Sequence, residues 1–179
     1  MTPAVSQSGT SPRWVIDPPK KSLIVGIGDM LISNDTSAQI VTYSLGSCVG
    51  VAIYDPVAKV GGMLHAMLPD STMNAERAAS RPNMFVDSGL PAMFHEVYAL
   101  GGLKHRMVVK MAGGAEFLDK NKFFNIGRRN IEALMTMLAR NGVKLEASAT
   151  GGHDCRTMRL DLATGAVTLD IPGNKPMSL

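Results

Sequence analysis

Three apolar runs rich in β-branched residues follow one another in the middle of the chain: AQIVTYS (residues 38–44), VGVAIY (residues 49–54) and VGGMLHAM (residues 60–67). β-Branched and aromatic side chains are typical of strands, and the Asp-Pro pair at residues 55–56 is typical of a turn. This stretch therefore predicts three successive strands. The first two are joined by the glycine-containing segment LGSCVG, residues 45–50.

The same pattern predicts further strands on both sides of this stretch, at residues 22–27, 106–111, 143–148, 157–162 and 166–171. The last two are separated by Ala-Thr-Gly and predict a hairpin. Strands outnumber helices and do not alternate with them regularly, which argues against a doubly wound parallel sheet.

Two helices are predicted from apolar side chains that recur with a period of 3.6 residues, one within residues 85–98 and one from Asn125 to Gly142. Pro91 lies inside the first, so we expect that helix to start late or to kink there. The polar stretch at residues 70–82 is predicted to be a loop.

These elements together predict an α+β domain with a β-sandwich-like core, in which sheets pack together and two main helices lie outside. Residues 1–21 are rich in Ser, Thr and Pro and predict a flexible N-terminal tail. The domain is expected to span residues 22–172, and residues 173–179 are expected to form a C-terminal tail.

The composition limits the classes of protein to which the chain can belong. The chain has 179 residues, 45% of them hydrophobic and 18% charged, as expected for one soluble globular domain. The N-terminus is not typical of a secretory signal, and no apolar run approaches the roughly 18 to 20 residues that cross a bilayer, so we expect a cytoplasmic protein without membrane insertion. The net charge of +3 is carried by scattered Lys and Arg, which does not favour nucleic-acid binding.

Two cysteines, Cys48 and Cys155, are too few for a disulfide framework, so at least one of them could be a working thiol. His153, Asp154 and Cys155 have no second Cys/His pair at a zinc-type spacing, so no metal site is expected. No organic cofactor is expected either.

Cys48 follows Gly46 and Ser47 in the turn between two predicted strands. A turn of this kind can present a side chain and expose backbone N–H groups that stabilise an oxyanion, but a buried core cysteine is an equally good interpretation. His65 lies in an apolar strand, where alternation places it on one face with Met63. It is either a hydrogen-bonded core histidine or a general base that would lower the thiol pKa of a nearby cysteine.

The order and spacing of several motifs closely resemble the CheD family of chemoreceptor glutamine deamidases. The resemblance is carried by IVTYSLGSCVGVAIYDPVAKVGGMLHAMLPD (residues 40–70), KMAGGAEF (110–117), NIGRRN (125–130) and TGGHDCR (150–156). It covers nearly the whole domain, residues 23–171.

The resemblance implies a Cys–His–Thr triad, which falls on Cys48, on His65 seventeen residues later and on Thr42 six residues before Cys48. Without the resemblance, a single threonine in a strand such as Thr42 gives almost no indication of a catalytic role. The implied fold is similar to that of cysteine-dependent deamidase toxins, and the backbone around Gly46 and Ser47 is expected to support the oxyanion.

The implied activity is hydrolysis of specific receptor glutamines to glutamate through a cysteine thioester, with chemoreceptor cytoplasmic domains as partners. Two alternatives stay open. The thioester could pass to an amine, as in a transglutaminase, or the protein could chiefly be a binding module that regulates a CheC-type phosphatase.

Overall fold

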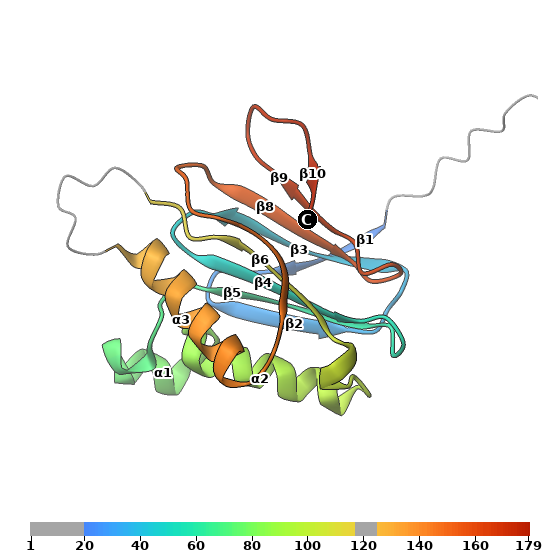
Figure 1. Cartoon of the computed structure of the whole chain (residues 1–179), viewed down its shortest axis with the longest axis horizontal. Helices are drawn as coiled ribbons and strands as arrows, with labels where there is room; N and C mark the ends of the chain where they lie inside the picture. The colour runs from blue at the N-terminus through green and yellow to red at the C-terminus, as the bar shows by residue number, and fades with distance from the viewer. Residues whose placement is uncertain (1–19, 117–124) are drawn as a thin grey trace, which may run out of the picture.

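The computed structural model describes residues 20–116 and 125–179, which form two five-stranded sheets stacked face to face with helices over one of them (Figure 1). The first sheet has the strand order β1-β3-β8-β9-β10, with β1 parallel to β3 and the other pairs antiparallel. Its strands are β1 (Lys21–Val25), β3 (Ala38–Leu45), β8 (Arg156–Asp161), β9 (Val167–Asp170) and β10 (Met177–Ser178).

The second sheet has the order β2-β5-β4-β6-β7, with only β6 and β7 parallel. Its strands are β2 (Asp29–Ser33), β4 (Val49–Asp55), β5 (Val60–Ala66), β6 (Val108–Gly113) and β7 (Leu145–Thr150). Consecutive strands β3 and β4 lie in different sheets, so the segment between them crosses from one layer to the other.

The helices pack on the outer face of the second sheet (Figure 1). The α-helices are α1 (Ala75–Ser80), α2 (Val86–Ala99) and α3 (Ile126–Arg140), and the 3₁₀ helices are η1 (Ser71–Met73), η2 (Pro82–Met84) and η3 (Lys104–Arg106). The predicted α+β class, with a sandwich core and two main helices outside, is confirmed. None of the helices in the described ranges is long and apolar enough to span a membrane.

Three local expectations differ from the structure. Residues 70–82, predicted to be a loop, contain η1 and α1, whose starts are capped by the side chains of Asp70 and Asn74. Strand β2 was not predicted; it pairs with β5 at the edge of the second sheet. Helix α2 begins at Val86 and therefore does not start late, and Pro91, its sixth residue, leaves one hydrogen bond of the helix unmade. A kink at Pro91 stays a prediction.

The expectations for the two ends lie partly outside the described residues. Residues 1–19 of the predicted N-terminal tail are not described, and β1 begins at Lys21, one residue before the predicted domain boundary. At the other end, the predicted tail 173–179 includes β10, which pairs with β9.

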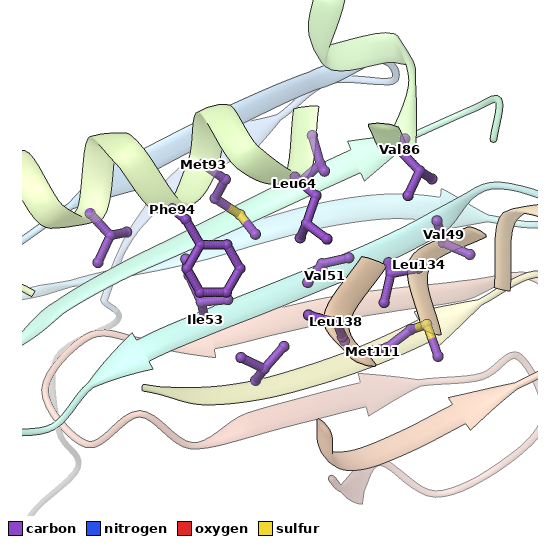
Figure 2. Packing of buried hydrophobic residues seen from close by; sticks show 14 of the residues in the cluster. Val49, Val51, Ile53, Leu64, Val86, Met93, Phe94, Met111, Leu134 and Leu138 are labelled. Atoms are coloured by element: carbon purple, nitrogen blue, oxygen red, sulfur yellow. The ribbon is translucent and has the colours of Figure 1, made fainter. Parts of the chain in front are cut away.

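Two apolar layers hold the sheets and helices together. The layer between the helices and the second sheet contains Val51, Ile53 and Leu64, and Figure 2 shows them facing Met93 and Phe94 of α2. The neighbouring residues on β4 and β5 point to the other side, into the layer between the two sheets. Because β4 is buried on both faces, its sequence is an apolar run up to Tyr54 rather than an alternating one, and only Asp55 at its end is charged.

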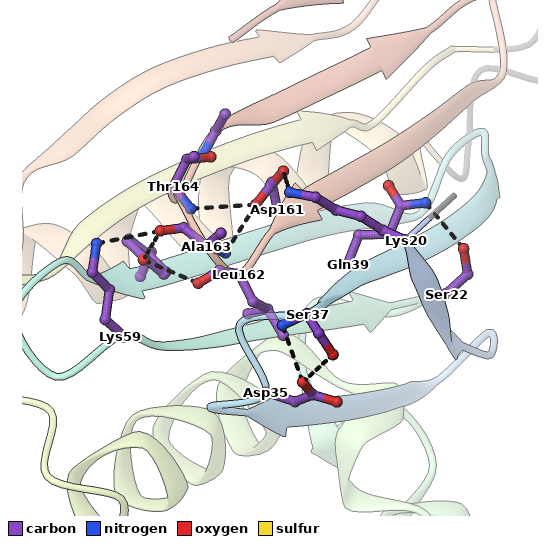
Figure 3. A network of polar contacts seen from close by, with 12 residues as sticks. Lys20, Ser22, Asp35, Ser37, Gln39, Lys59, Asp161, Leu162, Ala163 and Thr164 are labelled. Carbon is purple, nitrogen blue, oxygen red and sulfur yellow. Dashed lines mark hydrogen bonds and ion pairs between the residues drawn. The ribbon is translucent and has the colours of Figure 1, made fainter. Parts of the chain in front are cut away.

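Polar contacts fasten the turn after β8, which was predicted as part of the last hairpin. The Asp161 carboxylate accepts the N–H groups of Ala163 (2.8 Å) and Thr164 (3.2 Å) and an ion pair from Lys20 (Figure 3). This single side chain therefore fixes the turn and ties it to the start of β1.

Asp55 holds the end of the β4–β5 hairpin to the loop around η3. Its side chain is fully buried and accepts the N–H groups of Val57 (2.9 Å), Ala58 (3.0 Å) and Leu103 (2.9 Å). The Arg106 guanidinium adds two hydrogen bonds of 2.9 and 2.7 Å. Burial by itself would raise the pKa of Asp55, but Arg106 and these N–H groups hold it well below its usual range.

We expect Asp55→Asn to lower the free energy of unfolding by about 3 kcal/mol near neutral pH, because Arg106 loses its buried partner. Since the folded-state pKa of Asp55 is depressed, its stabilisation is present above the unfolded-state pKa of about 3.9 and is lost as the pH falls below that value. Urea unfolding at a series of pH values measures the difference between wild type and variant.

The half-exposed Asp170, paired with Arg159, provides the matched control. Asp170→Asn should change stability by about 0.5 kcal/mol or less. A wild-type advantage at Asp55 that persisted unchanged below about pH 3 would contradict the assigned charge state.

Candidate functional site

Thr42 and His65 meet between the two sheets. Thr42 lies on β3 of the first sheet and His65 on β5 of the second, and both side chains are fully buried. Thr42 Oγ1 lies 2.7 Å from His65 Nδ1. The predicted alternation is confirmed, because Met63 points into the layer between the sheets and Leu64 points toward the helices.

A third group determines the direction of this hydrogen bond. Thr42 Oγ1 lies 2.9 Å from the carbonyl oxygen of Val25, which can only accept. The single hydroxyl proton of Thr42 is therefore donated to Val25, and the hydroxyl oxygen accepts the Nδ1–H of His65. The proton of the neutral imidazole is thus on Nδ1, and Nε2 carries a free lone pair.

His65 Nε2 is buried and has no hydrogen-bond partner among the residues that the structure describes. Burial lowers the pKa of His65 to about 4, so the imidazole is neutral at physiological pH. A neutral, rigidly held imidazole with a free Nε2 has the form required of a general base.

Cys48 lies in the segment that crosses between the sheets, and its half-buried side chain packs against the layer between them. Gly50 pairs directly with His65, so Cys48, two residues earlier, is a diagonal neighbour of His65 on the same face, with Cα atoms about 7–8 Å apart. The two side chains make no hydrogen bond in this structure.

Burial raises the pKa of the Cys48 thiol. The expectation that His65 would lower this pKa is therefore wrong for the resting protein. Desolvation disfavours both the thiolate and the imidazolium, so the resting pair is a neutral thiol and a neutral imidazole.

Each of the three carbonyl groups of the segment Gly46–Ser47–Cys48 accepts a hydrogen bond. The N–H of Ala115 donates to Gly46 O and the N–H of Gly114 donates to Cys48 O, both at 2.7 Å. Ser47 O accepts the Asn130 side chain at 3.0 Å. The N–H groups of Gly46, Ser47 and Cys48 donate to no acceptor of another residue within the described part of the chain.

The chain also shares its sequence with a known family. The family model described as "CheD chemotactic sensory transduction" matches residues 67–170. A protein of Syntrophus aciditrophicus named "Probable chemoreceptor glutamine deamidase CheD 1" is 46% identical over 84% of this chain and 94% of its own length. The chain belongs to the CheD family.

Further CheD relatives come from distant organisms. The CheD 2 protein of Anaeromyxobacter dehalogenans is 46% identical over 81% of this chain and 91% of its own length. The CheD protein of Pyrococcus horikoshii is 41% identical over 83% of this chain and 91% of its own length. Among solved structures, Neisseria meningitidis protein NMB0706 of the DUF152 family aligns with a TM-score of 0.43 and 12% identity, covering 69% of this chain and 53% of that protein.

Several residues that shape the Cys48 segment of this CheD chain were not singled out from the sequence. Gly113 and Gly114 appeared only within the KMAGGAEF motif. In the structure a Cβ at Gly113 would lie 2.3 Å from Cys48 O, so only glycine lets β6 come this close. The single signal for Asn130 in the sequence was its place in the NIGRRN motif.

The remaining candidates make no hydrogen bond with His65, although Cys155 lies near enough to Cys48 for a second thiolate there to raise the pKa of the Cys48 thiol. Cys155 is exposed and precedes β8. Within residues 20–116 and 125–179, no three His, Cys, Asp or Glu side chains are grouped so that they could hold a metal ion. Two surface hollows, of about 230 and 360 Å³, are lined mainly by α2 and α3 and do not include Cys48 or His65.

Proposed function

We propose that this chain hydrolyses glutamine side chains of chemoreceptor cytoplasmic domains to glutamate, with Cys48 as the nucleophile and His65 as the general base. The observation that carries the proposal is the hydrogen-bond relay from Val25 O through Thr42 to His65, which leaves Nε2 unprotonated on the face that carries Cys48. The names of its CheD relatives support the choice of substrate.

In the first half-reaction, Cys48 Sγ attacks the carboxamide carbon of the glutamine while His65 Nε2 accepts the thiol proton. The tetrahedral intermediate collapses to a thioester, and the proton on Nε2 passes to the leaving nitrogen, which departs as ammonia. In the second half-reaction, His65 deprotonates a water molecule that attacks the thioester. Glutamate leaves, and the proton returns to Cys48 Sγ.

The developing oxyanion needs donors that are already oriented. The segment Gly46–Ser47–Cys48 has its carbonyl groups held by Ala115, Asn130 and Gly114, and its own N–H groups are not engaged. We propose that these N–H groups form the oxyanion hole. Because the carbonyls are anchored, the donors would not need to reorganise during the reaction.

The neutral resting pair predicts the pH dependence of the reaction. The active form requires unprotonated His65, whose pKa burial lowers to about 4. We therefore expect kcat/KM to stay high from neutral pH down to about pH 5 and to fall near pH 4, rather than near the ordinary histidine value of 6.5.

Initial rates of ammonia release, measured across this range, test the expected profile. Circular dichroism at each pH provides the control, because the depressed pKa of His65 also makes the fold less stable as the pH falls from about 6.5 toward 4. An acid limb near 6.5 in a protein that is still folded would show that the base is solvated rather than buried.

The proposal is tested directly by incubating the purified protein with a chemoreceptor cytoplasmic fragment and mapping the fragment by mass spectrometry. We expect specific glutamines to gain the small mass of deamidation, with release of ammonia, and we expect Cys48→Ala to be inert. Free glutamine should be a poor substrate, since contacts with a folded receptor position the reacting group. Backbone cleavage, or rapid turnover of free glutamine, would refute the proposal.

Two further arms of the experiment address the alternatives. An added primary amine that became attached to the receptor in preference to hydrolysis would identify acyl transfer. A CheC-type phosphatase partner stays a prediction, as does a cytoplasmic location. A Cys48→Ala protein that restored chemotaxis in cells would favour a regulatory binding role over catalysis.

A further inference from the structure

We infer that Asn130 is a positioning residue that sets the separation of Cys48 and His65. This inference rests on the proposed function. Asn130 lies on α3, outside both sheets, and is fully buried. It contacts neither the receptor glutamine nor the thiol in the proposed reaction, so it acts through the backbone segments that carry the reacting groups.

The side-chain amide of Asn130 joins the backbone segment that carries Cys48 to the end of the strand that carries His65. Nδ2 donates to Ser47 O at 3.0 Å and to Met67 O at 2.9 Å. Ser47 directly precedes Cys48, and Met67 follows His65 by two residues at the end of β5. Both hydrogens of one NH₂ group are used, so the two carbonyl oxygens are held at a separation determined by a single planar group.

The orientation of this amide is determined by its partners. With the amide flipped, Oδ1 would face two carbonyl oxygens, which cannot donate. Oδ1 of Asn130 is buried without a partner among the described residues, which costs free energy. This cost is offset by the two hydrogen bonds that Nδ2 donates, which an apolar side chain could not make.

The helix reaches this position because Gly127, one turn earlier, has no side chain. A Cβ at Gly127 would lie 2.6 Å from both Gly114 O and Ala115 O. The same two residues donate their N–H groups to Cys48 O and Gly46 O. Helix α3 therefore rests directly on the segment that anchors the Cys48 loop, and Asn130 extends this contact to the end of β5.

The separation that Asn130 controls is the one on which the reaction depends. Cys48 and His65 are diagonal neighbours with no hydrogen bond in the resting state, so the proton transfer requires a small closure of the gap between them. A displacement of about 1 Å in such an arrangement can lower a rate on the order of 100-fold.

Asn130→Leu separates positioning from stability, because leucine has a similar shape, lacks the donors and removes the unpaired Oδ1. With the receptor fragment as substrate, we expect kcat to fall on the order of 100-fold with KM nearly unchanged. The rate of Cys48 alkylation by iodoacetamide, followed by peptide mapping, should fall toward that of His65→Ala, while alkylation of the exposed Cys155 stays the same.

Leu134→Ala is the matched control, since Leu134 is the next buried residue on the same face of α3 and touches no carbonyl of the Cys48 loop. It should lower the melting temperature but leave kcat close to that of wild type at temperatures where it is folded. Asn130→Asp, which keeps the shape and loses the NH₂ donors, should show the same loss of kcat as Asn130→Leu.

The outcomes distinguish this inference from the proposed function. A wild-type protein that does not deamidate the fragment overturns the proposed function. Wild-type activity together with an unchanged kcat and unchanged Cys48 alkylation in a folded Asn130→Leu or Asn130→Asp overturns the positioning role. If both variants fail to fold while Leu134→Ala folds, Asn130 is a structural residue and the inference is wrong.

Discussion

His65→Ala should lower kcat for receptor deamidation by on the order of 10⁴-fold or more while the protein stays folded. The substitution removes Nε2, the one unprotonated nitrogen on the face of Cys48, and the burial-raised pKa of the thiol leaves almost no thiolate at neutral pH to react without a base. Deamidation of the fragment by mass spectrometry measures the loss. Circular dichroism checks the fold.

Thr42→Val provides the graded comparison, because valine keeps the β-branched shape and removes only the hydroxyl. The imidazole would lose the acceptor that holds the proton on Nδ1, and both tautomers would then be populated. We expect a loss of roughly 10- to 100-fold, smaller than for His65→Ala, since an orienting group is easier to replace than a base. A larger loss for folded Thr42→Val than for folded His65→Ala would reverse the assigned roles.

Gly113→Ala should both destabilise the protein and inactivate it. Gly113 has φ +101°, a conformation that L side chains rarely adopt, and its Cβ would lie 2.3 Å from Cys48 O. The backbone of the Cys48 segment would have to move, which would displace the thiol and the proposed oxyanion donors together. We expect a loss of about 3 kcal/mol or more in the free energy of unfolding and a loss of activity on the order of 100-fold.

Gly151→Ala is the control that separates the effect of backbone strain from the effect of the steric clash with Cys48 O. Gly151 also has a positive φ, +74°, but a Cβ there meets nothing within 4 Å. It should therefore cost only the strain, about 1 kcal/mol, and leave activity almost unchanged. The activities are compared under conditions in which both variants are folded. Equal losses of activity for Gly113→Ala and Gly151→Ala would then show that the close approach of Gly113 to Cys48 is unimportant for the reaction.

The fold could be predicted well where side-chain patterns are local. The three central strands were predicted within one residue of β3, β4 and β5, because each is a continuous run of strand-forming residues between clear turn signals. Strand β2 and strand β10 could not be predicted in this way. They are short strands at sheet edges, and their extended conformation depends on pairing with β5 and β9 rather than on their own residues.

The site could be predicted only as a set of candidates. Cys48 stood out because it follows Gly46 and Ser47 in a turn, but a buried core cysteine was an equal interpretation, and Thr42 stood out only through the resemblance. Asn130 appeared only as part of the NIGRRN motif, because its buried contacts with Ser47 and Met67 join residues 83 and 63 positions away. No local pattern encodes such contacts.

By itself, the sequence determined that His65 shares a face of its strand with Met63, and that Cys48 lies in the turn that follows Thr42. These are consequences of the two-residue period of a strand. Only the tertiary structure decided what meets that face. Stacking of the sheets brings Thr42 against Nδ1, and the carbonyl of Val25, on β1, determines that the proton stays there. Burial then keeps both the imidazole and the thiol neutral, because desolvation depends on the packing of the whole molecule and not on the neighbouring residues in the chain.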